Sequence, residues 1–328
     1  MSWPVISRHR KDEDPWLSLL DGPFVLDDSM DLVRQTLKSA SSAIRVGYAF
    51  TMSDIKTIII PVTCYGLLSA PETPGIHTMS RLLIWVWLYL LQFCAANQMY
   101  SPEEDCANKP YRPIPAGLMS VESTYFLRWS LVPICLYISW QEHVLIPGLL
   151  LTGAFWAYNE GNLDARWYSK NLLNAIGIVS WDVGASKIAS AGFASLNEIF
   201  WMAPLLSLGL IWTTIHVQDF RDEIGDRMQG RITFPTLLPE GSRYITSFVI
   251  NAWTLALGWY WGLSTTSYWL FLSLGAYLSL RIFFQRTEGE DKVSLRVYMV
   301  WLTIARTLPF LQLWAEGTQL LLPTVTSS

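Results

Sequence analysis

The sequence predicts an all-α, polytopic membrane protein with nine transmembrane helices. Composition is the first observation: 51% of the 328 residues are hydrophobic and only 15% are charged, whereas soluble domains carry about 25% charged residues. The second is a series of nine apolar segments, each close to the roughly 20 residues that cross a bilayer. The third is the gathering of lysine and arginine on alternate loops. Together these observations exclude a disordered, collagen-like or coiled-coil chain.

The nine candidate spans divide the chain into three regions. We expect a cytosolic N-terminal segment over 1–50, a transmembrane helical domain over 51–318 and a short tail over 319–328. Prolines inside several spans are tolerated where neighbouring helices satisfy the freed backbone groups. The spans lie near residues 52–70, 81–98, 123–140, 142–158, 171–190, 196–217, 243–263, 266–284 and 295–315.

The lysine and arginine residues mark one side of the membrane. With nine spans, the even-numbered loops face the same side as the N-terminus, and 19 of the 23 Lys and Arg residues lie on that side. The other four lie inside spans or at their far ends: Arg81, Arg128, Lys187 and Arg306. Cytosolic loops carry the excess of positive charge. We therefore expect the N-terminus and the loops after the second and sixth spans to be cytosolic.

The N-terminal segment is polar at its start, MSWPVISRHRKDEDPW, and predicts no cleavable signal peptide. Further on, apolar residues recur at helical spacing, at Leu32, Val33, Leu37, Ala40 and Ile44. This pattern predicts a helix that begins near Asp28 or Ser29. An interfacial amphipathic helix and a solvated cap helix remain equally open.

Charge and cysteine usage exclude other classes of protein. The net charge is −4, which does not mark a nucleic-acid binder. Four cysteines form no CxxC pair and no zinc spacing with histidine, so we expect neither a disulfide framework nor a zinc site. No feature indicates a protein partner.

Asp219, Asp222 and Asp226 lie in the loop that follows the sixth span. Their spacing, i, i+3 and i+7, places them on one face if the segment is helical. Three crowded carboxylates repel each other unless a cation neutralises them, and Mg²⁺ is commonly bound by carboxylates together with substrate phosphates. Two interpretations stay open here: a Mg²⁺ site, or a solvated acidic loop partnered by Arg221 and Arg227.

Asn97, Ser101 and Asp105 follow the second span at spacing i, i+4 and i+8. An amide and a carboxylate can both ligate Mg²⁺. Lys109 and Arg112 come next, and the planar fork of arginine matches phosphate oxygens. Taken alone, this segment is more typical of an ordinary polar loop than of a metal site.

The two acidic loops support each other because they share one predicted membrane face. Together they can hold Mg²⁺ ions on opposite sides of a diphosphate. The nearby cations are then candidate diphosphate ligands: Lys109, Arg112, Arg227 and, as a weaker candidate, Lys56.

Aromatic residues lie below the acidic loops in the predicted bundle. They include Trp85, Tyr89 and Phe93 on one helix, and Phe155, Trp156, Tyr158 and Trp181 on the fourth and fifth spans. Aromatic faces can house an isoprenoid tail and stabilise a carbocation. Packing and interface belts account for most of the 17 tryptophans.

Asp182 and Lys187 are ionisable residues inside a predicted span, where charge is costly and indicates function. Because they are five residues apart, only a loose pair between them is plausible. A structural ion pair and a pair that contacts substrate are both open.

The two loops resemble the aspartate-rich motifs of the UbiA family of membrane prenyltransferases. The usual first motif is NDxxDxxxD followed by RP, and the second is DxxxD or DxxDxxxD ending in GD. The second motif matches closely, whereas the first has Gln98 and Ser101 where the family has acids. The matching residues, within a resemblance over most of 50–315, are Asn97, Asp105, Arg112-Pro113, Asp219, Asp222 and Gly225-Asp226.

The resemblance implies nine helices around a central cavity, in a multi-pass protein of the endoplasmic reticulum. It also implies Mg²⁺ as cofactor and an isoprenoid diphosphate as substrate, with the lipid bilayer as surroundings. Asp105 and Asp226 would be catalytic. The metal ligands would be Asn97, Asp105, Asp219, Asp222 and Asp226.

Three functional hypotheses follow. Phrases such as LLQFCAANQ and HVQDFRDEIGDRMQGRITFP resemble a fungal branch of the family that contains terpene cyclases. The resemblance therefore favours a cyclase that ionises an allylic diphosphate, expected to be farnesyl diphosphate, and forms a sesquiterpene. A prenyltransferase with an aromatic acceptor is the second hypothesis. A non-enzymatic membrane carrier or scaffold is the third.

Overall fold

The computed structural model describes residues 41–100, 102–190, 198–228 and 230–315. The chain divides into two units, residues 1–45 and 46–328, and the description below concerns the second. Most of the predicted amphipathic helix, the C-terminal tail and Ser101 lie outside the described residues. The domain bounds expected from the sequence remain a prediction.

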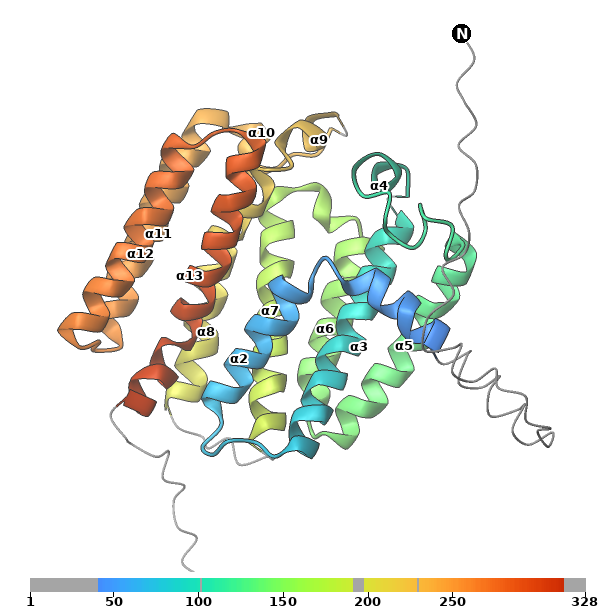
Figure 1. The fold of residues 1–328 in the computed structure, drawn as a ribbon, viewed down its shortest axis with the longest axis horizontal. Helices are drawn as coiled ribbons and strands as arrows, with labels where there is room; N and C mark the ends of the chain where they lie inside the picture. Colours follow the sequence, from blue (N-terminus) through green and yellow to red (C-terminus); the bar gives the residue numbers. More distant parts are fainter. Residues whose placement is uncertain (1–40, 101, 191–197, 229, 316–328) are drawn as a thin grey trace, which may run out of the picture. The chain divides into compact units, whose positions relative to one another are not determined.

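The described residues are mostly helical and contain no β-strand, so the all-α prediction is confirmed. Figure 1 shows the helices in order along the chain. They are η2 (Ile55–Ile59), α2 (Ile60–Ser69), α3 (Ile76–Tyr100), α4 (Pro102–Asn108), α5 (Val121–Gln141), α6 (Leu145–Asn159), η3 (Leu163–Ala165), α7 (Trp167–Ala189), α8 (Glu198–Thr214), η4 (Ile215–Asp219), α9 (Glu223–Met228), α10 (Phe234–Leu237), α11 (Pro239–Tyr260), α12 (Thr265–Phe284) and α13 (Glu288–Ala315).

Within the described part of the chain, nine long helices overlap the nine predicted spans: α2 with η2, then α3, α5, α6, α7, α8, α11, α12 and α13. By length and composition, three described segments are apolar enough to cross a membrane, namely Ile76–Tyr100, Ile199–Asp219 and Thr265–Phe284. Other helices carry charge at their ends, as α13 does at Glu288, Glu290 and Asp291. The number of membrane crossings therefore remains a prediction.

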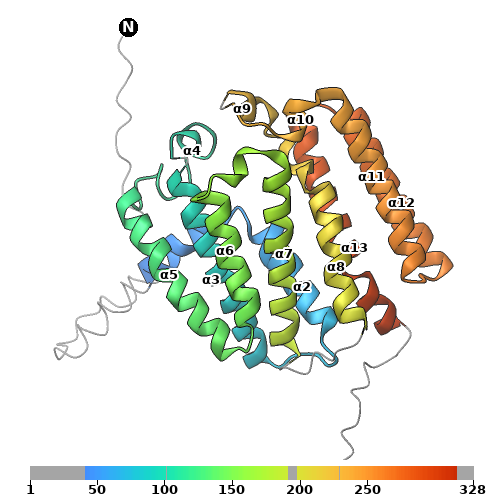
Figure 2. The same cartoon turned by 180° about the vertical axis from the view of Figure 1, so that it is seen from behind.

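Helix α7 lies at the centre of the packing and contacts α2, α3, α6 and α8 (Figures 1 and 2). It contributes Trp181 and Ala185 to a core shared with α2, α3, α5 and α6. It also contributes Ala175 and Ile178 to a second core shared with α8, α11, α12 and α13. Two apolar faces on one helix bury it on both sides.

Gly184 allows the closest approach within the first core. A Cβ atom at this position would lie 2.2 Å from Trp85 of α3, so only glycine fits.

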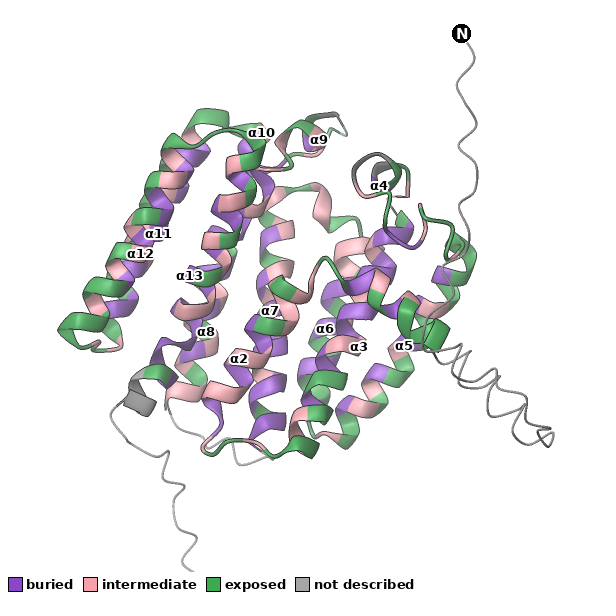
Figure 3. Ribbon diagram, viewed as in Figure 1, coloured by how far each residue is buried: buried purple, intermediate pink, exposed green. Residues whose placement is uncertain are grey.

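Figure 3 shows exposed residues on the outer helices α11 and α12. On α12 many of them are large and apolar: Trp269, Leu270, Tyr277, Leu280 and Phe284. Such a surface suits contact with lipid.

Asp182 pairs with Arg306 of α13 rather than with Lys187. Arg306 Nη1 donates a hydrogen bond to Asp182 Oδ2, and both side chains are at most 2% exposed. Lys187 is exposed. A separation of five residues turns two side chains to different faces of a helix, whereas the long arginine reaches Asp182 from the neighbouring α13. The expected loose pair is wrong.

Candidate functional site

Asp105 of α4 forms a buried ion pair with Arg112. The Arg112 Nη1 atom donates to both carboxylate oxygens of Asp105, at 2.7 and 2.8 Å. Backbone hydrogen bonds from Lys109 to Asp105 and from Arg112 to Lys109 curl the chain back beneath the carboxylate. Burial alone would lower the pKa of Arg112, but its hydrogen bond to Asp105 and the charge of that carboxylate raise the pKa overall. The structure therefore joins two of the predicted site residues.

The other predicted residues of the first loop are less enclosed. Asn97 lies in the last turn of α3, and α4 begins at Pro102, so Asn97 and Asp105 belong to different helices. Asn97 and Lys109 are partly exposed, and Lys56 on η2 is exposed. The backbone of Lys109 is hydrogen-bonded to Asp105 and Arg112, whereas the Asn97 and Lys56 side chains belong to other helices than the Asp105–Arg112 pair.

Asp54 is a neighbour of this pair that sequence reasoning missed. Its carboxylate accepts a hydrogen bond from the Cys94 thiol at 3.7 Å, and its charge acts on Arg112. The preceding Ser53 hydroxyl lies 3.5 Å from the Tyr111 hydroxyl of the first loop. Because Asp54 comes from a distant part of the chain, no local spacing indicated it.

Gln98 explains the departure from the family's first motif. Its Nε2 donates to the Phe50 carbonyl at 2.9 Å, and the side chain is 1% exposed. The amide therefore ties α3 to the segment that precedes Asp54. An acid at this position would lose the donor that Phe50 requires.

The second loop contains a buried carboxylate paired with a lysine that was not predicted. Lys170 Nζ at the start of α7 lies 2.7 Å from Asp219 Oδ1 at the end of η4. Burial lowers the pKa of Lys170, but the charges of Asp219 and Asp226 and the hydrogen bond to Asp219 raise the pKa overall. Lys170 thus stays charged beside two of the three predicted acids.

Asp226 is the second buried carboxylate of this loop. Burial raises its pKa, and the positive charge of Lys170 opposes that rise. Arg231 Nη1 lies 3.7 Å from the Oδ1 atom of Asp226. The Oδ2 atoms of Asp219 and Asp226 are both buried without a hydrogen-bond partner. Two orphaned carboxylate oxygens fit a hard cation such as Mg²⁺.

Asp222 and Arg227 are more exposed than the two buried acids. Asp222 accepts from Arg221 at 3.1 Å, while Arg227 pairs with Glu223 at 2.8 Å. A turn at Asp222 separates η4 from α9, so the three acids do not lie on one continuous helix, although backbone hydrogen bonds link Asp222 to both Asp219 and Asp226. Among the described residues, no three His, Cys, Asp or Glu side chains form a ready-made metal cluster.

Contacts around His216 hold η4 in place, just before the turn that separates η4 from α9. The His216 Nε2 atom lies 2.6 Å from Thr246 Oγ1 of α11, and Nδ1 lies 3.4 Å from Asn171 Nδ2 of α7. The ring also packs edge-on against Phe234, at 4.7 Å between centroids. Three elements therefore hold η4, which places Asp219 against Lys170.

An aromatic wall extends from this site into the bundle. We use this name for Phe93 of α3, Phe155 and Tyr158 of α6, and Trp181 of α7. Ring centroids are 5.1 Å apart for Phe93–Phe155, 5.6 Å for Phe93–Tyr158 and 5.4 Å for Phe155–Trp181. Tyr158 also interacts electrostatically with Lys170. The wall thus begins beside the charged cluster.

Trp85 and Tyr89, which were expected on the same surface, belong to the same buried core as Phe155 and Trp181, and the Tyr89 and Phe155 ring centroids are 6.5 Å apart. Both Trp85 and Tyr89 are fully buried and share the Ser139 hydroxyl of α5 as their partner. They pack between helices.

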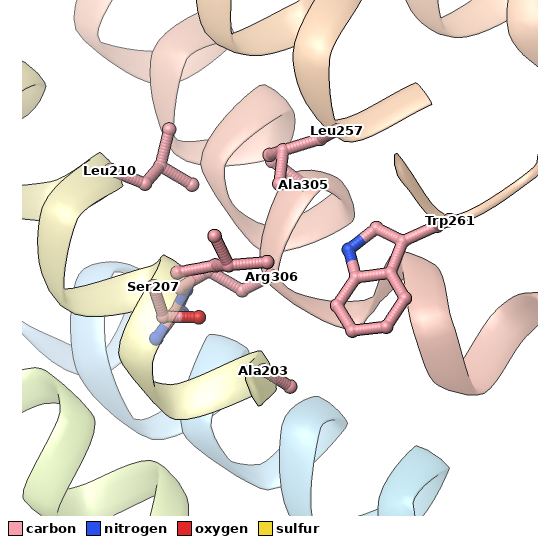
Figure 4. A pocket seen from close by; sticks show the side chains of 8 residues that line it. Ala203, Ser207, Leu210, Leu257, Trp261, Ala305 and Arg306 are labelled. Atoms are coloured by element: carbon pink, nitrogen blue, oxygen red, sulfur yellow. The ribbon is translucent and has the colours of Figure 1, made fainter. Parts of the chain in front are cut away.

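A separate pocket lies between α8, α11 and α13 (Figure 4). Arg306 and Trp261 line it, and none of the predicted site residues does.

Helices α4 and α9, which carry Asp105 and Asp226 of the two motifs, lie at the same end of the bundle in both views (Figures 1 and 2). The charged clusters of the two loops therefore share one end of the helices.

Comparisons with known proteins agree with this arrangement. Residues 58–304 match the model of the UbiA prenyltransferase family. The chain is 31% identical to the fumagillin beta-trans-bergamotene synthase of Aspergillus fumigatus, over 85% of this chain and 96% of the relative. It is 29% identical to the somaliensene A/B synthase of Streptomyces somaliensis, over 80% and 91%.

The fold also resembles that of a solved UbiA homolog from Archaeoglobus fulgidus bound to GPP and Mg²⁺. The TM-score is 0.60 at 12% identity, over 81% of this chain and 99% of that one. The family match covers most of the chain, and the helical arrangement agrees with it. This chain belongs to the UbiA prenyltransferase family.

Proposed function

We propose that the protein is a membrane-bound, Mg²⁺-dependent terpene cyclase that ionises farnesyl diphosphate and cyclises it to a sesquiterpene. The observation that carries the proposal is the position of the aromatic wall beside Lys170 and the two buried carboxylates, Asp219 and Asp226. This places cation-stabilising rings where an allylic chain would lie if its diphosphate met the charged cluster. The relatives named above add support, since both are named as synthases of a single product type rather than as transferases.

The buried acids are the strongest candidates for metal ligands. Asp219 and Asp226 each offer an unpartnered oxygen, and Asp105, Asp222 and Asn97 complete the proposed set. Bound Mg²⁺ would supply charge neutralisation of the diphosphate leaving group. Asp105 enters this role only by loosening its contact with Arg112.

Cationic side chains would hold the diphosphate oxygens. Lys170 and Arg112 are positioned by carboxylates on either side of the site, while Lys109, Arg227 and Lys56 are more exposed and can close over a ligand. Charge-assisted hydrogen bonds of this kind strengthen as negative charge develops on the departing oxygen. They would therefore favour cleavage of the allylic C–O bond.

The aromatic wall would protect and steer the resulting cation. Rings at Phe93, Phe155 and Trp181 exclude water and present π faces, which attract positive charge. A new C–C bond then forms within the same chain. Loss of one proton completes the olefin, and the released diphosphate is a base close at hand.

The decisive experiment is an assay of membranes that contain the protein, supplied with farnesyl diphosphate and Mg²⁺. A hydrocarbon product formed without an acceptor supports the cyclase. A product formed only after a phenol is added would make the protein a prenyltransferase. Absence of diphosphate release under every condition would favour a non-enzymatic carrier. Membranes with the Asp219→Asn/Asp226→Asn variant provide the matched control.

We also propose that both acidic loops face the cytosol, in the endoplasmic reticulum membrane. Cys106 is exposed in the first loop and Ile224 is 70% exposed in the second, so each can carry a label. A variant that keeps only Cys106 and another that has only Ile224→Cys should react with an impermeant maleimide from the cytosolic side. A Glu72→Cys variant should react only from the other side. Opposite labelling of the two loops would end the shared-site model.

A further inference from the structure

In the part of the chain that the structure describes, close contacts explain the buried helical glycines, with one exception. At the five others in α2 to α13, an added Cβ atom would lie between 2.2 and 3.0 Å from a neighbouring atom. A larger residue would collide there, so packing requires glycine. These five are Gly66, Gly148, Gly184, Gly258 and Gly275.

Gly177 of α7 is the exception. It is buried, yet a Cβ atom there would meet only Phe155 Cε1 within 4 Å, at 3.9 Å, an ordinary contact distance. Its backbone is not among those with positive φ. Glycine inside a helix costs about 1 kcal/mol relative to alanine. Neither packing nor backbone conformation accounts for a glycine at position 177. The open space beside Gly177 therefore needs another explanation.

That space lies on the face of α7 that leads away from the charged cluster. Lys170, Gly177 and Trp181 are separated by seven and four residues and so share one face of the helix. At 1.5 Å per residue, Gly177 lies about 10 Å and Trp181 about 16 Å along the helix from Lys170. Phe155 of the aromatic wall borders both positions.

We propose that Gly177 leaves room for the isoprenoid chain and that, with Trp181 beyond it, this position sets the length of chain the enzyme accepts. Gly177 is then a specificity-determining residue. The inference rests on the proposed function, because it assumes that a diphosphate binds beside Lys170. The chain would run from that cation along the glycine face, against Phe155, and end near the indole of Trp181.

The test measures diphosphate release by the purified full-length enzyme from geranyl, farnesyl and geranylgeranyl diphosphates. The variants are Gly177→Ala, Gly177→Leu and Trp181→Ala. Gly153→Leu is the matched control, because Gly153 is an exposed helical glycine of α6 with nothing within 4 Å of its Cβ position. Thermal unfolding in detergent reports the folding of each variant.

A side chain at position 177 should shorten the accepted chain without unfolding the protein. We expect Gly177→Leu to lower kcat/KM for the longest accepted substrate at least tenfold relative to geranyl diphosphate. Gly177→Ala should lower the ratio of kcat/KM for the longest accepted substrate to kcat/KM for geranyl diphosphate at least threefold. Its Tm should be no lower than that of the wild type. Trp181→Ala should shift it towards longer chains, and Gly153→Leu should leave it unchanged.

The outcomes separate this inference from the function on which it rests. If the wild type releases diphosphate from none of the three substrates, the proposed function fails. If the wild type is active but the Gly177 variants slow all three substrates equally, or not at all, the length-setting role is overturned. If Gly177→Leu fails to fold, the substrate ratio of kcat/KM measured for Gly177→Ala is decisive. A threefold shift in that ratio supports the length-setting role, and an unchanged ratio overturns it.

Discussion

Lys170 and Asp219 form an ion pair, with 2.7 Å between Nζ and Oδ1, that joins the start of α7 to the end of η4. The two residues are 49 positions apart in the sequence. Their side chains are 11% and 2% exposed, so water reaches the lysine more readily than the carboxylate. The pair marks the point where the charged end of the bundle meets the aromatic wall.

Replacing Lys170 by methionine should weaken substrate binding without weakening metal binding. The variant loses a charge-assisted hydrogen bond to diphosphate, worth about 1.5–3 kcal/mol, so KM should rise at least about tenfold. Asp219 loses its competing cation, so the affinity for Mn²⁺ without substrate, measured by paramagnetic resonance, should hold or increase. The control is Lys187→Met, at the exposed far end of the same helix. Weaker Mn²⁺ binding by the Lys170 variant would instead mean that the lysine only holds Asp219 in place.

Asp226→Asn should reduce Mg²⁺-dependent turnover far more than Asp222→Asn does. Asp226 is buried with an unpartnered oxygen, whereas Asp222 is exposed and already paired with Arg221. Loss of a preorganised group that stabilises developing charge costs about 10²–10³ in rate. Steady-state kinetics over a Mg²⁺ titration, with Glu240→Gln as an exposed-surface control, measures the difference. Equal effects at the two aspartates would contradict the larger role of the buried Asp226, and activity that persists in EDTA would contradict the metal assignment.

Gln98→Glu, which restores an acid of the usual family motif, should destabilise the protein. The carboxylate cannot donate to the Phe50 carbonyl, and it places a charge at a site that is 1% exposed. An unsatisfied buried group costs about 1–3 kcal/mol, and more when it is charged. Thermal unfolding in detergent should show a lower Tm than for Gln98→Met, which loses the donor but buries no charge. A Glu variant as stable as wild type, with higher turnover, would show that Gln98 is a degraded metal ligand.

Breaking the Asp182–Arg306 pair should cost more stability than breaking any exposed pair. Both side chains are at most 2% exposed, so Asp182→Leu leaves an uncompensated buried charge, at about 3–5 kcal/mol. The double variant Asp182→Leu/Arg306→Met should recover most of that loss, because it removes both charges. Glu240→Gln, which breaks the exposed pair with Arg286, should cost about 1 kcal/mol or less. A double variant no more stable than the single one would show that the pair contributes net stability.

The sequence by itself determined the helical architecture. Apolar segments near 81–98 and 171–190 correspond to α3 and α7 because burial of apolar surface follows local composition. The two acidic loops were also visible, since each sets carboxylates at a fixed spacing after an apolar helix. Such patterns are properties of neighbouring residues, which the sequence displays directly.

Only the tertiary structure decided which of these residues meet. Lys170 reaches Asp219, and Arg306 reaches Asp182, across contacts between helices that no local spacing encodes. The turn after Asp219 likewise depends on His216 being held by two other helices. Gly177 and Gly184 look alike in the sequence. The structure separates them because the space around each depends on how closely a neighbouring helix approaches.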